Sequence, residues 1–177
     1  MMTRIPFPEL ETERLELRKL NKKDADQILK IRSDDEVVKY VEMSKYKSIE
    51  DAGNFIVRVE NGVQEGKIIF WGITLKETSK VIGTICLWNL DKNMHKAEVG
   101  FDLLPHFQGL GIASEALDCV IDYGFHKMQL KIIEGYTNIE NKAAIKLLTR
   151  KGFEKMDVIT EGKMLMGIYW LNESTAI

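Results

Sequence analysis

The spacing of apolar residues predicts a strand, two helices and two further strands in the first half of the chain. Residues 15–20 alternate between apolar and polar side chains, which predicts a first strand. Asn21 and Asp24 then suit the start of a helix. Ser48 and Asp51 resemble a capping box, and a second helix follows with apolar residues at three- and four-residue intervals: Ile49, Ala52, Phe55, Ile56, Val59 and Val63. Residues 68–75 and 81–90 predict two antiparallel strands.

The second half of the chain alternates strands with helices. Residues 97–104 have the pattern of a strand, and residues 112–126 place apolar side chains at helical spacing. A strand over 130–136 precedes a helix that opens at Asn141 and ends near Gly152, since glycine commonly follows a helix end. Residues 153–158 and 163–171 complete the sheet as a hairpin.

This order of elements predicts one domain over residues 1–177, of the α/β class and the α+β type. The central strand–helix–strand unit makes its two strands parallel, whereas the other neighbouring strands are antiparallel. We therefore expect a mixed, mostly antiparallel sheet of about six or seven strands, with about four helices on its faces.

The stretch QGLGIAS at residues 108–114 lies between a predicted strand and a predicted helix. Gly109 and Gly111 let the backbone turn tightly, so that several N–H groups and the positive end of a helix dipole meet. Such a turn suits a phosphate or a diphosphate; the alternative is a glycine turn that only packs closely. A dinucleotide site is disfavoured because no acidic residue ends the next strand. A nucleoside triphosphatase is disfavoured because no Gly-Lys-Ser/Thr is present.

Composition excludes several classes of protein. The chain is 45% hydrophobic and 29% charged, which is typical of a globular domain. A net charge of −2 argues against direct binding of nucleic acid, and no apolar run has the length of a membrane span. Cys86 and Cys119 are expected to be buried and reduced, which favours the cytoplasm. The three histidines are scattered, so we expect no metal.

Three motifs, in the right order, resemble the GNAT superfamily of N-acetyltransferases. Residues 105–113 (PHFQGLGIA) resemble its acetyl-CoA loop, with Gln108, Gly111 and Ala113 at the defining positions. Residues 138–145 resemble the segment that lies beside pantetheine. Residues 11–18 (ETERLELR) are similar to the start of the branch that contains the ribosomal-protein N-terminal acetyltransferases.

The resemblance implies acetyl-CoA as the cofactor and a sheet whose crossover strands diverge around pantetheine. The backbone of Phe101 and Leu103 would face pantetheine, and Asn138 and Asn141 would contact it, although both asparagines also suit turns or caps. The diphosphate would be bound by the N–H groups of the loop, namely Gln108, Gly109, Leu110, Gly111, Ile112 and Ala113. Proteins that share this resemblance are often homodimers, which makes a homodimer possible here, but no residue of the sequence indicates one.

A general base and a proton donor complete the predicted site. Glu98 is the candidate base; the alternative is a strand carboxylate paired with a neighbour. Gly100 predicts a bulge, which would free an N–H near Phe101 to polarise the acetyl carbonyl. Leu148 stands where many family members have a tyrosine acid. Ser114 or water is therefore expected to supply the proton, although Ser114 also suits a contact with the helix start or with a phosphate.

The expected reaction is acetyl transfer to a primary amine by direct attack on the thioester. The resemblance implies a protein N-terminal α-amine as the acceptor, such as that of a ribosomal protein. An α-amine has a pKa of about 8 and therefore needs only modest help from a base. Two alternatives stay open: a small-molecule acceptor (polyamine, amino acid or aminoglycoside) and a non-catalytic acyl-CoA sensor. Candidates to line the acceptor side are Tyr40, Phe70, Trp71 and Trp88.

Overall fold

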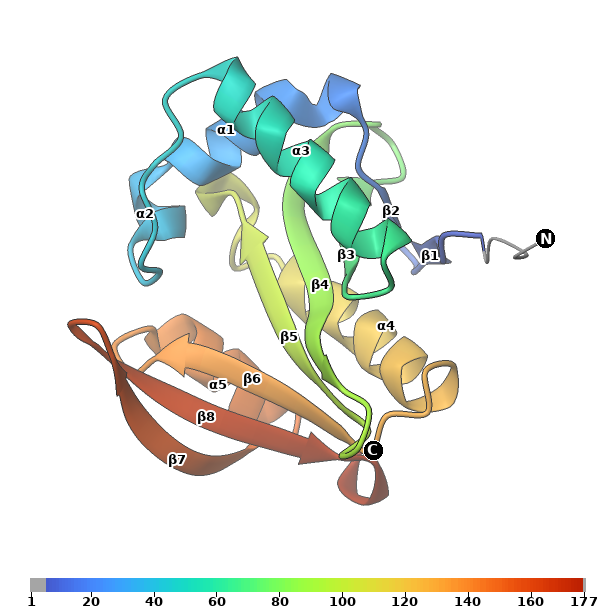
Figure 1. The fold of residues 1–177 in the computed structure, drawn as a ribbon, viewed down its shortest axis with the longest axis vertical. Helices are drawn as coiled ribbons and strands as arrows, with labels where there is room; N and C mark the ends of the chain where they lie inside the picture. The colour runs from blue at the N-terminus through green and yellow to red at the C-terminus, as the bar shows by residue number, and fades with distance from the viewer. Residues whose placement is uncertain (1–5, 177) are drawn as a thin grey trace.

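The structure is a computed structural model that describes residues 6–176. Over these residues the chain forms one eight-stranded sheet in the order β1-β2-β3-β4-β5-β6-β8-β7 (Figure 1). The strands are β1 (Leu10–Glu11), β2 (Leu15–Lys19), β3 (Ile69–Leu75), β4 (Val81–Asp91), β5 (Lys96–Leu103), β6 (Ile132–Asn138), β7 (Glu154–Glu161) and β8 (Met164–Asn172).

Within the same residues, the helices are α1 (Ala25–Ser33), the short α2 (Asp35–Val38), α3 (Ile49–Gln64), α4 (Ile112–His126) and α5 (Lys142–Arg150). Single 3₁₀ turns lie at Lys22–Asp24, Pro105–Phe107 and Glu173–Thr175. Both expected capping motifs are present, at Asn21 and at Ser48. Each satisfies backbone N–H groups that would otherwise lack acceptors at a helix start.

The sheet is antiparallel except at its centre, where β5 and β6 run parallel through the crossover helix α4. Their pairing begins with Lys96 opposite Ile132 and ends with Val99 opposite Gly135. Beyond that point the two strands diverge, and the sheet divides into an arm of β1–β5 and an arm of β6, β8 and β7 (Figure 1). The predicted mixed sheet and its central crossover are confirmed.

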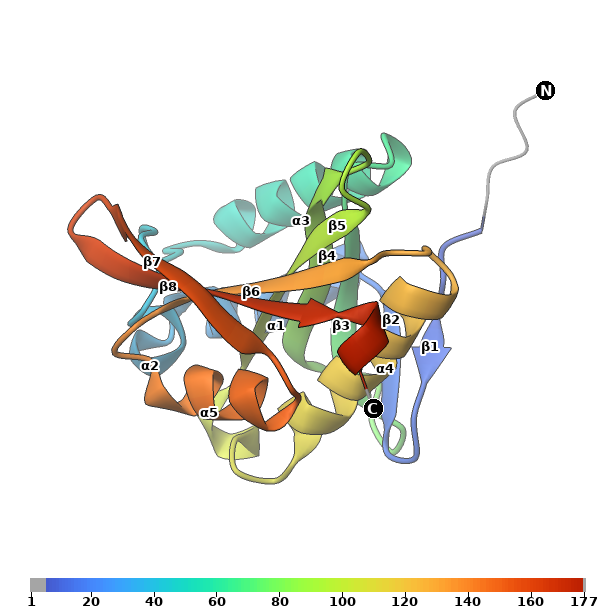
Figure 2. The same ribbon diagram turned by 90° about the horizontal axis from the view of Figure 1, so that it is seen from below.

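Helices cover both faces of the sheet. In Figure 2, α3 lies above the strands, and α4 and α5 lie below them. On the first face, Ile28 of α1 and Ile56 of α3 share a core with Phe70 of β3. On the other face, Leu117 of α4 and Leu148 of α5 belong to the larger core. The elements that frame the opening between the arms are thus anchored by buried apolar side chains.

Two differences from the expected strands have simple causes. The eighth strand is β1, whose two residues pair with β2 and are too few to show an alternating pattern. The strand β6 begins at Ile132, two residues later than expected. Leu130 is apolar and only 6% exposed, but it packs in the core without lying in a strand.

The bulge expected at Gly100 is wrong. The register between β4 and β5 is continuous from Glu98 to Leu103. The irregularity in this strand pair falls instead between Trp88 and Asp91 of β4. A glycine in a strand marks either a bulge or a close approach, and Gly100 is of the second kind, because a Cβ there would lie 3.2 Å from a cysteine sulfur of β4.

Candidate active site

The divergence of β5 from β6 leaves backbone groups of β5 facing an opening in the sheet. The N–H of Leu104 donates to Ile82 O on β4. Because backbone groups alternate sides along a strand, those of Leu103 and Phe101 point the other way, toward β6. The Leu103 carbonyl is consistent with this direction, since it accepts a hydrogen bond from Gln108 Nε2 at 2.8 Å and not from β4. The Phe101 N–H thus faces the opening because the strands diverge, not because of a bulge.

Residues 108–114, which we call the glycine loop, lead from the opening into α4. Gly109 and Gly111 have φ values of +74° and +78°, a left-handed conformation that favours glycine. Among the described residues no side chain caps α4, so the N–H groups of Ile112, Ala113 and Ser114 have no capping acceptor. A Cβ on Gly109 would meet open space. The loop therefore fits an anion such as a diphosphate.

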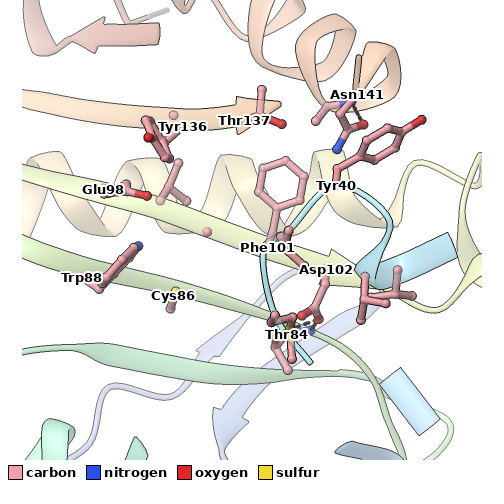
Figure 3. A pocket seen from close by; sticks show the side chains of 18 of the residues that line it. Tyr40, Thr84, Cys86, Trp88, Glu98, Phe101, Asp102, Tyr136, Thr137 and Asn141 are labelled. Atoms are coloured by element: carbon pink, nitrogen blue, oxygen red, sulfur yellow. Dashed lines mark hydrogen bonds between the residues drawn. The ribbon is translucent and has the colours of Figure 1, made fainter. Parts of the chain in front are cut away.

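A cavity of about 540 Å³ adjoins the opening. Its walls come from both arms of the sheet, from α2 and the segment after it, and from the start of α5. Figure 3 shows side chains from these elements converging on one space. The lining residues with polar or aromatic side chains include Tyr40, Glu42, Trp88, Glu98, Asp102, Tyr136, Asn141 and Glu161.

Glu98 lines this cavity from β5, with only 9% of the residue exposed. Burial, together with the negative charges of Glu134 and Glu161, raises the pKa of Glu98 to about 7. A carboxylate with such a pKa accepts and releases a proton near neutral pH, as a general base must. Glu134 lies opposite Glu98 on β6, but its carboxylate binds Lys96 Nζ at 3.0 Å. Of these two facing carboxylates, Glu134 is therefore the one held in an ion pair with a neighbour, and within residues 6–176 Glu98 is not.

The irregularity of β4 supplies a partner for Glu98. Asn89 has a φ of +50°, a left-handed conformation that asparagine tolerates better than most residues. Its side chain hydrogen-bonds to Glu98 and opposes the rise in the pKa of that carboxyl. Bulges often occur next to active sites, where they redirect a side chain. Sequence reasoning missed Asn89, because a left-handed residue inside a strand leaves no periodic pattern.

Tyr136 is a second residue that sequence reasoning missed. It lies at the divergent end of β6, and its ring faces the space above Glu98 (Figure 3). Its hydroxyl donates to Glu161 Oε2 at 3.1 Å. Burial and the Glu161 hydrogen bond raise the pKa of Tyr136 to about 12, so the phenol keeps its proton. Leu148 also lines the cavity, but it has no hydroxyl and packs on Gly135.

The structure brings some of the predicted site residues to the cavity and places others elsewhere. Glu98, Phe101 and Asn141 line it, and Asn141 also caps α5 by accepting the Ala144 N–H at 3.1 Å. Asn138 is buried, and its side chain accepts the Glu140 N–H in a turn. Ser114 lies in the first turn of α4 and is not among the lining residues, so its role as an acid stays a prediction.

The four aromatic candidates for the acceptor side divide into residues that line the cavity and one that lies in the core. Tyr40, Phe70 and Trp88 line the cavity, and Trp88 is 44% exposed. Trp71 is fully buried, with its indole N–H donating to Pro8 O, and so belongs to the core. Periodicity puts the neighbours Phe70 and Trp71 on opposite faces of β3. It does not say which of the two faces carries the cavity.

The charges that line the cavity are unbalanced. Arg32 is paired with Asp102, with 3.4 Å between Nη2 and Oδ2. Over residues 6–176, by contrast, no basic nitrogen lies within ion-pair distance of the carboxylates of Glu42, Glu98 or Glu161. A surplus of carboxylates attracts cations, so the cavity is suited to a positively charged molecule.

Residues 6–176 show neither a membrane-spanning helix nor a metal-binding cluster. None of their helices has the length and apolar character needed to span a bilayer. They contain no group of three or more His, Cys, Asp or Glu side chains arranged to hold a metal ion.

Known proteins resemble the chain over most of its length. The family described as "Acetyltransferase (GNAT) domain" matches residues 14–154. "Uncharacterized N-acetyltransferase p20" of Bacillus licheniformis is 37% identical over 158 residues, which are 89% of each chain. "Uncharacterized N-acetyltransferase YoaA" of Bacillus subtilis is 36% identical over 155 residues, which are 88% of each chain.

A solved structure shares the fold at lower sequence identity. The ribosomal-protein-S5-alanine acetyltransferase of Vibrio fischeri superposes with a TM-score of 0.82 at 19% identity, over 96% of this chain and 100% of its own. The family match spans both the glycine loop and the diverging strands. The chain therefore belongs to the GNAT acetyltransferase family and is an acetyl-CoA-dependent N-acetyltransferase.

Proposed function

We propose that the protein acetylates a primary amine that binds beside Glu98, with Glu98 as the general base. Acetyl-CoA supplies the activated acetyl group as a thioester. An ammonium group must lose a proton before it can act as a nucleophile, and Glu98 is the cavity carboxylate whose pKa lies near neutrality. The observation that carries the proposal is the burial of Glu98 beside the opening in the sheet, with its pKa raised to about 7.

The chain's own groups would hold the cofactor along the opening. We assign the diphosphate to the N–H groups of the glycine loop and pantetheine to the backbone of Phe101 and Leu103, with Asn141 nearby. The Phe101 N–H is directed into the opening and is the candidate donor to the acetyl oxygen. The left-handed glycines and the uncapped start of α4 support this assignment.

Two residues are candidates for the acid that protonates the departing CoA thiolate. Tyr136 presents the cavity with a phenol that keeps its proton and is oriented by Glu161. Ser114, the donor expected from sequence, lies in the glycine loop outside the cavity lining. We favour Tyr136 because it lines the cavity; to protonate the leaving thiolate, its hydroxyl would turn from Glu161 toward the sulfur of CoA.

The predicted acceptor was a protein N-terminal α-amine, and the fold shared with the Vibrio fischeri protein supports that class. The charges of the cavity add a requirement. Glu42 and Glu161 line the same cavity as Glu98 and have no basic partner among the described residues. Trp88 offers an aromatic surface to a cation. We therefore propose an acceptor with a second positive charge near its amine. Either a basic protein N-terminus or a free polyamine would meet this requirement.

A panel of amines tests the proposal and separates these two sources. Release of free CoA thiol would be followed with peptides that begin Ala, Ser or Thr, each with a neutral or a basic second residue. Spermidine, an aminoglycoside and the monoamine propylamine complete the panel. We expect acceptors with two positive charges to be preferred over their single-charge partners, and Glu161→Gln to reduce that preference. Equal turnover of the matched acceptors would contradict the second charge.

Replacing Glu98 with glutamine tests the base. We expect Glu98→Gln to lower kcat by about 10²–10⁴, the usual contribution of a general base, while calorimetry shows unchanged affinity for CoA. The matched control is Glu134→Gln on the neighbouring strand, which removes a carboxylate outside the cavity lining and should affect kcat far less. Full turnover by Glu98→Gln would remove this residue from the mechanism.

A further inference from the structure

The segment between β1 and β2 holds the start of α4 through one side chain. Glu115, in the first turn of α4, receives hydrogen bonds from the Thr12 hydroxyl and from the backbone N–H of Arg14. It also forms an ion pair with Arg14, with 2.7 Å between Nε and Oε2. The same guanidinium donates from Nη1 to Leu110 O at 3.0 Å. Arg14 therefore connects the first turn of α4 to the glycine loop.

The bond to Leu110 fixes the direction of one peptide unit in that loop. The described peptide bonds are all trans, and in a trans peptide the C=O and the N–H point in opposite directions. With the Leu110 carbonyl turned toward Arg14, the Gly111 N–H points away from the guanidinium. Nη2 of Arg14 lies 3.4 Å from the position of a Cβ on Gly111. The guanidinium thus occupies one side of the loop and leaves the N–H on the other.

Arg14 also balances a charge that would oppose an anion. Burial would raise the pKa of Glu115, but hydrogen bonds from Thr12 and Arg14 lower it below its usual value, so the side chain is a carboxylate. A negative charge in the first turn of α4 would repel a diphosphate at the same helix end. The adjacent guanidinium cancels it at short range.

We propose that Arg14 is a positioning residue for cofactor binding: it holds the Leu110–Gly111 peptide so that its N–H faces the diphosphate, and it neutralises Glu115. This inference rests on the proposed assignment of the diphosphate to the glycine loop. Thr12 and Arg14 belong to residues 11–18, which have no part in the proposed acetyl transfer. Their contacts with Glu115 give them a role in cofactor binding instead. Arg14 acts through the loop and need not touch the cofactor.

Calorimetry of CoA binding to Arg14→Ala tests the inference without an acceptor, so failure to find an acceptor would not affect it. We expect the Kd for CoA to rise about tenfold, the size of one lost charge-assisted hydrogen bond. Dephospho-CoA keeps the diphosphate and should lose affinity by the same factor. Pantetheine, measured as a competitor of acetyl-CoA, has no diphosphate and should be unaffected.

Two further variants separate positioning from general stability. Adding Glu115→Gln to Arg14→Ala removes the unbalanced carboxylate, and we expect it to recover part of the CoA affinity. Arg18→Ala removes an arginine from the same segment that is also ion-paired, with 2.8 Å between Nη2 and Asp24 Oδ1. This control should lower the melting temperature with an unchanged Kd for CoA. The proposal is overturned if Arg14→Ala leaves the Kd for CoA unchanged, weakens pantetheine equally, or spares dephospho-CoA.

Discussion

At the scale of single residues, the site depends on how the fold sets the proton affinity of Glu98. Burial and two neighbouring carboxylates raise the pKa of this carboxyl to about 7. A base must be deprotonated to act, so kcat/KM should rise with pH and level off above about 7. The same raised pKa means that the folded chain binds this proton more tightly than the unfolded chain. The contribution of Glu98 to stability therefore falls as the pH rises from about 4.5 to about 7.

Asn89 offers a direct test of this control. Its hydrogen bond lowers the pKa of Glu98, so Asn89→Gly should move the acidic limb of the kcat/KM profile to higher pH. Glycine is the matched replacement because Asn89 has a positive φ, which glycine adopts without strain. Rates from pH 5 to pH 9 measure the shift. An unmoved limb would show that Asn89 does not tune the base.

At the scale of elements, the junction of β5 and α4 combines a turn, a helix start and a set of free N–H groups. Gly111→Ala should destabilise the fold by about 1–2 kcal/mol, because an L side chain is strained in the left-handed conformation. It should also raise the KM for acetyl-CoA. Urea unfolding and steady-state kinetics measure the two effects.

Gly66 is the matched control for that substitution. It has a φ of +68°, a Cβ there would meet open space, and it lies at the end of α3, away from the glycine loop. Gly66→Ala should cost similar stability and leave the KM for acetyl-CoA unchanged. If both variants raised this KM equally, the effect would be one of stability alone.

At the scale of the whole molecule, the two arms of the sheet are paired through four residues of β5 and four of β6. A cofactor bound in the opening would bridge the arms. Hydrogen exchange should therefore slow at the Phe101 and Leu103 amides when CoA is added. At a free CoA concentration of 100 times its Kd, CoA binding stabilises the folded state by about 2.7 kcal/mol. Amides of β3 that exchange by local opening serve as the control, and protection confined to them would contradict binding in the opening.

The sequence by itself determined the order of the elements and the place of the glycine loop. Periodicity located all four long helices and the seven longer strands of residues 6–176, because apolar spacing reports directly on the face that an element buries. The glycines at 109 and 111 indicated a tight turn before a helix, and this turn is a local property of the chain. Glu98 was identified for the same kind of reason, from its place on the central strand.

Only the tertiary structure decided which side chains meet at the site. Tyr136, Glu161 and Glu42 reach one cavity from separate elements, and Asn89 approaches Glu98 through an irregularity of β4. The partnership of Arg14 with Glu115 joins residues 101 positions apart. Sequence spacing describes faces of single elements, whereas these contacts depend on how the elements pack against each other.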